Sequence, residues 1–116
     1  MKKIISVVLI LLLLTACDSK YEVINTNKAL ELIDNGAIVI DVRTKDEYNS
    51  GHIKNAINIP LDTIDYIDID KDTIIIVYCA SGIRSTEAAK KLYDLGFNNL
   101  YNLDGGLLNW GGNLEE

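Results

Sequence analysis

Short apolar runs alternate with helical patterns along most of this chain. Several of the runs are continuous instead of alternating between apolar and polar residues, which is typical of strands covered on both faces in a parallel sheet. The runs are residues 21–24, 37–42, 56–59, 73–78 and 100–103. Because helical segments separate them, the pattern predicts an α/β fold with a mainly parallel central sheet of about five short strands flanked by helices.

The helical segments lie at residues 28–34, 45–49, 61–67 and 85–95. The last is the clearest, because Ala88, Leu92 and Leu95 recur at helical spacing and Gly96 follows as a C-terminal stop. Thr26 or Asn27 is the expected cap of the first helix.

The N-terminal segment predicts export. Lys2 and Lys3 precede an apolar run and small residues before Cys17, which is the order of a secretory signal peptide. The run is shorter than the roughly 20 residues of a membrane-spanning helix. The stretch LTAC, residues 14–17, resembles the lipobox of bacterial lipoproteins, whose cysteine is acylated, for example with palmitate. Ordinary cleavage with an unmodified Cys17 is the alternative.

These features predict a signal peptide at residues 1–16, an acylated tether at 17–20 and one folded domain at 21–116. The mature protein would be anchored through its acyl chains to the extracytoplasmic side of the cell membrane. The anchor would be its contact with the membrane.

The composition limits the other partners. The chain carries 11 Lys and Arg against 17 Asp and Glu, a formal net charge of −6, which argues against nucleic acid as a partner. Acylation of Cys17 would leave Cys79 without a disulfide partner, and His52 is the only histidine. We therefore expect no metal and no cofactor. We also expect a monomer. Cys79 is either a buried small hydrophobe or a reactive thiol.

The stretch CASGIRS, residues 79–85, favours the reactive thiol. It follows an apolar run and leads into the last helix, and ligands of open parallel sheets bind beyond the carboxyl ends of strands. Backbone N–H groups of such a turn can form an anion-binding nest beside a helix N-terminus. Gly82 lets the turn close, and Arg84 adds a fixed positive charge. Such surroundings lower the pKa of a cysteine and predict a thiolate at Cys79.

CASGIRS resembles the active-site loop of single-domain rhodaneses, sulfurtransferases that carry sulfur as a cysteine persulfide. DVRTKDEYNSGHIKNAINIP, residues 41–60, and LDGGLLNW, residues 103–110, resemble the family's first and closing signatures. The resemblance implies the rhodanese-like fold and thiosulfate sulfurtransferase activity. The Cys79 thiolate would take sulfur from a donor such as thiosulfate and pass it to a thiol or dithiol, which includes a protein acceptor, or to cyanide.

The resemblance also assigns roles to the residues around Cys79. Arg84 would hold the anionic end of the donor, since its planar fork suits an oxyanion. The backbone N–H groups that would assist it belong to Ala80, Ser81, Gly82, Ile83 and Ser85.

Residues of the two flanking signatures are expected to support this loop. Asp41 and Arg43 would act from a neighbouring strand end, with direct substrate contact as the alternative. His52 is expected to make structural hydrogen bonds rather than to act as a general base. Asn55 stands where relatives usually have glycine, and asparagine best tolerates the left-handed backbone that this position then requires. The closing signature, with Gly105, Gly106 and Trp110, is interpreted as a tight turn followed by a core aromatic residue.

Two other functions remain open at this point. Cysteine-dependent phosphatases also combine a thiolate, a ring of N–H groups and an arginine. Their loops place one more residue between cysteine and arginine than the four at positions 80–83 here, so this smaller ring favours a single sulfur over a tetrahedral phosphate. Rhodanese-like domains can also be catalytically silent binding or sensing modules, although the intact Cys79, Gly82 and Arg84 count against that reading.

Overall fold

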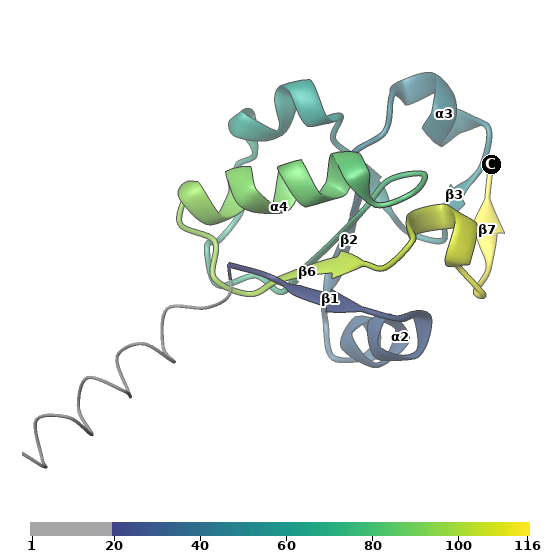
Figure 1. The fold of residues 1–116 in the computed structure, drawn as a ribbon, viewed down its shortest axis with the longest axis horizontal. Coiled ribbons are helices and arrows are strands. Elements are labelled where there is room, and N and C mark those ends of the chain that lie inside the picture. The colour runs from purple at the N-terminus through teal and green to yellow at the C-terminus, as the bar shows by residue number, and fades with distance from the viewer. Residues whose placement is uncertain (1–19) are drawn as a thin grey trace, which may run out of the picture.

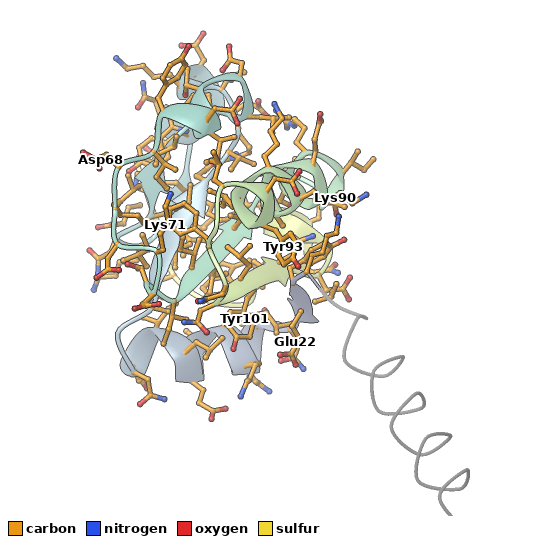
Figure 2. The ribbon with its side chains drawn as sticks, turned by 90° about the vertical axis from the view of Figure 1, so that its left-hand side faces the viewer. Glu22, Asp68, Lys71, Lys90, Tyr93 and Tyr101 are labelled. Atoms are coloured by element: carbon orange, nitrogen blue, oxygen red, sulfur yellow. The ribbon has the colours of Figure 1, made fainter. Side chains whose placement is uncertain are left out.

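A five-stranded parallel sheet forms the centre of the domain (Figure 1). The protein is represented by a computed structural model that describes residues 20–116. Every strand pair of this sheet is parallel, so the predicted α/β architecture is confirmed. In spatial order the strands are β1 (Glu22–Ile24), β6 (Leu100–Leu103), β5 (Ile75–Tyr78), β2 (Ile38–Asp41) and β4 (Ile57–Asn58). Glu22 of β1 pairs with Tyr101 of β6 in the register of these strands, and both residues are labelled in Figure 2.

Helices cover both faces of the sheet. α2 packs on one face, whereas α4 and η1 pack on the other (Figure 1). The helices are α2 (Thr26–Asp34), α3 (Lys45–Asn49), η1 (Leu61–Tyr66), α4 (Ile83–Asp94) and η2 (Gly106–Asn109). The four predicted helical segments are present, with η1 as a 3₁₀-helix. The 3₁₀-helix η2 was not predicted. None of the helices within residues 20–116 is both long enough and apolar enough to span a membrane.

Strand β5 explains why the apolar runs are continuous. Ile75 and Val77 pack toward α4, whereas Ile76 and Tyr78 pack toward α2, because successive side chains of a strand point to opposite faces. All four are buried. Cys79 continues the alternation and lies on the α4 side, with the core cluster that contains α4.

Some local features differ from the prediction. The cap of α2 is Asn25, whose side chain accepts a hydrogen bond from the Lys28 backbone N–H at 2.9 Å, and not Thr26 or Asn27. A second, antiparallel sheet pairs β3 (His52–Ile53) with β7 (Leu114–Glu115). Each of these strands is two residues long, which is too short to show an alternation of apolar and polar residues in the sequence. Asn55 has a φ of 66° and therefore takes the predicted left-handed conformation.

The predicted signal peptide and the acylated Cys17 lie outside the described residues. Within residues 20–116, the elements run from β1 to β7, and the boundaries of the expected domain at 21–116 stay a prediction.

Candidate active site

The segments that follow β2, β5 and β6 meet at one edge of the sheet. The Val42 backbone N–H donates to the Tyr78 carbonyl at 3.0 Å, directly before Cys79. From the turn after β6, the N–H groups of Leu107 and Leu108 donate to the carbonyls of Cys79 and Ala80 at 2.9 and 3.2 Å. All three signature stretches found in the sequence therefore contribute to one site.

The loop after β5 folds around the sulfur of Cys79. Gly82 takes a left-handed conformation with a φ of 105°, and this bend turns the following backbone back toward the strand end. As a result, the N–H groups of Gly82 and Ser85 donate to Cys79 Sγ at 3.1 and 3.4 Å. Cys79 is only 1% exposed. The sulfur thus lies at the centre of a nest of backbone donors.

This nest changes the acidity of the Cys79 thiol. Burial raises the pKa, whereas the hydrogen bond with the Ser85 side chain and those from the backbone N–H groups of Ser85, Gly82 and Ser81 lower it. Together these bonds outweigh burial, so the pKa of Cys79 lies below its ordinary value. A lowered pKa increases the fraction of nucleophilic thiolate near neutral pH.

Arg84 lies in the first turn of α4 and pairs with Glu47 of α3. Its Nη1 and Nη2 donate to Oε1 and Oε2 of Glu47 at 2.7 and 2.9 Å. The hydrogen bond from Arg84 is the main cause that lowers the pKa of Glu47 to about 2. Thr44 forms a capping box with Glu47 and so fixes its position at the start of α3. The spacing of Thr44 and Glu47 could have indicated the cap, but not the contact with Arg84.

A cleft of about 340 Å³ lies beside Arg84, bordered by η1 and α4. Its lining combines apolar residues with two basic and two acidic side chains: Val42, Thr44, Pro60, Leu61, Asp62, Arg84, Glu87 and Lys91. The cleft therefore offers space for a small molecule next to the guanidinium.

Asp41 and Arg43 form a buried ion pair at the end of β2. Arg43 Nη2 donates to Asp41 Oδ2 and to the Gly51 carbonyl, each at 2.7 Å. The hydroxyl of Tyr78 donates to the same carboxylate and accepts from the Ile53 N–H at 3.1 Å. Burial, and next the hydrogen bond to Asp41, raise the pKa of Tyr78 above its ordinary value. Through the hydroxyl of Tyr78, this pair thus connects β2 to the residue before Cys79. No hydrogen bond within residues 20–116 joins its side chains to the sulfur.

His52 makes contacts that suit a structural role. Its ring stacks on Tyr48 with centroids 3.7 Å apart, and its Nδ1 lies 3.0 Å from the Tyr48 carbonyl oxygen. Nε2 lies 3.8 Å from a carboxylate oxygen of Glu115 in β7. These contacts connect α3 with the small sheet, as expected of a structural histidine.

Gly106 supports the Cys79 loop, a role that the sequence did not reveal. Gly105 and Gly106 both have positive φ angles, 70° and 58°, and form the predicted turn. A Cβ atom on Gly106 would lie 2.3 Å from the Cys79 carbonyl oxygen and 2.8 Å from that of Ala80. The turn can therefore approach the loop only because this residue has no side chain. Trp110 is half-buried against the core cluster on the α2 side.

Asn102 of β6 was also missed. It is buried, and its Oδ1 accepts from the Ser85 hydroxyl at 2.7 Å. Ser85 Oγ in turn lies 3.6 Å from Cys79 Sγ.

Comparison with known proteins agrees with this geometry. Residues 25–113 match the family model described as Rhodanese-like domain. A rhodanese-related protein from Thermoplasma volcanium superposes with a TM-score of 0.74 at 33% identity, covering 82% of this chain and 98% of that one. A rhodanese-like domain protein from Staphylococcus aureus gives a TM-score of 0.73 at 33% identity, covering 81% and 96%.

Curated relatives carry a different name. The chain is 36% identical over 85 residues to a tRNA uridine(34) hydroxylase of Hamiltonella defensa, covering 66% of this chain and 24% of that protein. The corresponding enzyme of Yersinia pestis is 33% identical over 91 residues, covering 72% and 26%. The chain thus spans about a quarter of the length of these relatives.

These names contradict one prediction. A tRNA is a cytoplasmic molecule, so an enzyme named for its action on tRNA meets its substrate in the cytoplasm. The prediction of an exported protein, anchored by lipid to the extracytoplasmic side of the membrane, is therefore wrong.

Proposed function

Because this chain belongs to the rhodanese-like domain family, we propose that it is a sulfurtransferase in which Cys79 carries sulfur as a persulfide. The observation that supports this best is the position of Cys79 Sγ, within 3.4 Å of the backbone N–H groups of Gly82 and Ser85. These donors favour the thiolate, which is the nucleophilic form of cysteine.

Sulfur transfer takes two steps at this site. The Cys79 thiolate attacks the outer sulfur of a donor such as thiosulfate, a new S–S bond forms, and sulfite leaves with the electron pair of the old one. An acceptor thiolate then attacks the outer sulfur of the persulfide, and Cys79 departs as the thiolate. The N–H groups of Gly82 and Ser85 stabilise the negative charge in both steps, because they need no rearrangement when it develops.

Arg84 supplies the positive charge that an anionic donor requires. Its guanidinium lies at the 340 Å³ cleft. The positive charge is permanent because the arginine side chain stays protonated. Two of its nitrogens already face Glu47, so donor and carboxylate share the guanidinium. Asp41 and Arg43 hold the neighbouring strand end and do not contact the donor.

Persulfide formation tests the proposal directly. After incubation with thiosulfate, mass spectrometry should find one additional sulfur atom on Cys79, and cyanide should remove it as thiocyanate. Cys79→Ser should abolish both results, whereas Cys17→Ser should preserve them. A thiol that stays unmodified with several sulfane-sulfur donors would favour a binding module. Efficient hydrolysis of aryl phosphates without sulfur transfer would favour a phosphatase-like enzyme.

A further inference from the structure

A buried chain of side-chain hydrogen bonds lies beneath the Cys79 loop. It runs from Cys79 Sγ to Ser85 Oγ at 3.6 Å, and from there to Asn102 Oδ1 at 2.7 Å. Asn102 Nδ2 continues it to Thr86 Oγ1 at 2.9 Å, and Thr86 Oγ1 ends it on the Gly82 carbonyl at 2.7 Å. Ser85 is fully buried and Asn102 is 4% exposed. The chain therefore connects the sulfur to both β6 and the turn of its own loop.

The Gly82 carbonyl fixes the direction of every bond in this chain. A carbonyl oxygen only accepts, so the single hydroxyl proton of Thr86 points at Gly82. Thr86 must then accept from Asn102, which places Nδ2 toward Thr86 and Oδ1 toward Ser85. Ser85 donates its own proton to Oδ1 and meets the sulfur with an acceptor lone pair. This arrangement suits a protonated Cys79 thiol, which can donate.

Ionisation of Cys79 changes its sulfur from a hydrogen-bond donor into an acceptor. A thiolate has no proton and requires a donor, but the Ser85 proton is committed to Asn102. If the Ser85 hydroxyl alone rotated, the buried Oδ1 of Asn102 would lose its donor from Ser85, which is costly in a protein interior.

A half turn of the Asn102 amide avoids this loss. Nδ2 then donates to Ser85, Ser85 donates to the sulfur, and Oδ1 accepts from the Thr86 hydroxyl. Thr86 gives up its bond to the Gly82 carbonyl, but that carbonyl still accepts from the Thr86 backbone N–H at 3.2 Å. Every group in the chain therefore keeps a partner in both states.

We propose that Asn102 is a positioning residue whose side-chain amide reverses its orientation when Cys79 becomes a thiolate. The reversal turns the Ser85 hydroxyl from an acceptor of the thiol into a donor to the anion. This inference rests on the proposed function, in which the thiolate is the reacting form. The charged groups around the site are Arg84 with Glu47, and the Asp41–Arg43 pair beside Tyr78. None of them belongs to the hydrogen-bond chain.

NMR spectroscopy of the full chain can observe the reversal. The ¹³Cβ shift of Cys79 reports its ionisation, and nuclear Overhauser effects report which neighbour the Asn102 amide protons face. As pH rises through the Cys79 transition, those contacts should move from Thr86 to Ser85 with the same midpoint. Cys79→Ser, which does not ionise in this range, should keep the contacts on Thr86 throughout. An amide that stays on Thr86 while Cys79 ionises would overturn the proposal.

A carboxylate at position 102 tests the same point chemically. In its ionised form, the carboxylate of Asn102→Asp offers only acceptors, so it holds the Ser85 proton and withholds it from the sulfur. Alkylation of Cys79 by iodoacetamide, measured at a pH below the wild-type Cys79 transition and quantified on its peptide, should slow about tenfold for each unit by which the pKa rises.

The added negative charge is controlled by repeating the substitution without Ser85. In a Ser85→Ala background, Asn102→Asp should slow alkylation much less than in the wild type, because the hydrogen-bond route is absent. Equal slowing in both backgrounds would mean that charge alone acts, and would overturn the proposal. Neither the NMR measurement nor the alkylation measurement uses a sulfur donor. Amide reversal without persulfide formation would therefore refute the proposed function, whereas persulfide formation with a fixed amide would refute this inference.

Discussion

Glu47 and Arg84 join α3 to α4 through two hydrogen bonds of 2.7 and 2.9 Å. Their side chains are 36% and 37% exposed, so water screens the pair, and it stabilises the fold by about 1 kcal/mol or less. Its main consequence is electrostatic. A carboxylate lies against the guanidinium that we propose to bind an anionic sulfur donor.

Glu47→Gln should therefore strengthen donor binding. Glutamine keeps the capping box of α3 but removes the negative charge. The KM for thiosulfate should fall by up to about fivefold, because unit charges about 4 Å apart in water interact by about 1 kcal/mol. The gain should shrink as ionic strength rises. Steady-state kinetics at low and high salt measure both effects.

Glu31→Gln is the matched control for this prediction. Glu31 pairs with Lys28 on α2, on the other face of the sheet from α4 (Figure 1), so its loss should leave the KM unchanged. A KM that rises with Glu47→Gln would show that the orientation given by Glu47 matters more than its charge.

Gly106→Ala should displace the Cys79 loop. The new Cβ would clash with the carbonyls of Cys79 and Ala80, at 2.3 and 2.8 Å, in a backbone with a φ of 58°. Overpacking of this kind costs about 1–3 kcal/mol, and we expect a loss of that size in urea denaturation together with slower persulfide formation. Gly111→Ala is the control, because its Cβ would meet only a methyl group of Thr26 at 3.9 Å. Unchanged activity in Gly106→Ala would show that the loop does not depend on this turn.

The fold was largely predictable because each parallel strand is buried on both faces and so appears as an apolar run. Cys79 and Gly82 were found for a similar reason, since the loop geometry depends on residues that are adjacent in sequence. Glu47 and Asn102 were missed because their contacts with Arg84 and Ser85 depend on how separate elements pack. Gly106 was interpreted as a turn alone, since the nearness of the Cys79 carbonyl follows from β5 and β6 being neighbours.

Tyr78→Phe should destabilise the domain by about 1–3 kcal/mol. The substitution removes the hydroxyl that accepts from the buried Ile53 N–H and donates to Asp41, so Ile53 loses that partner. Thermal or urea denaturation measures the loss. Tyr66→Phe is the control, because Tyr66 is 84% exposed and its hydroxyl stays in water. Equal stability of the two variants would mean that the Tyr78 hydroxyl adds nothing to the link between β5 and the Asp41–Arg43 pair.

The pH dependence of persulfide formation reports the nest around Cys79. Burial raises the pKa of this thiol, but the hydrogen bonds from Ser85, Gly82 and Ser81 lower it further than burial raises it. The rate should therefore climb as pH passes the lowered pKa and level off below the range in which an ordinary thiol ionises. Ser85→Ala removes the hydroxyl and keeps the backbone N–H, so it should move the climb to higher pH.

The same shift links ionisation of Cys79 to folding. A thiol whose pKa is lower in the folded state adds stability above its unfolded pKa, and this contribution disappears as pH falls through the folded pKa. The free energy of unfolding of the wild type relative to Cys79→Ser should therefore increase with pH between the folded and the unfolded pKa of Cys79. Ser85→Ala should narrow this pH interval. Lys90→Ala is the control, because Lys90 extends from the outer face of α4 (Figure 2) and should change neither profile. A wild-type rate that climbs only in the range of an ordinary thiol would mean that the backbone donors do not overcome burial, and Cys79 would then lack the activation that sulfur transfer requires.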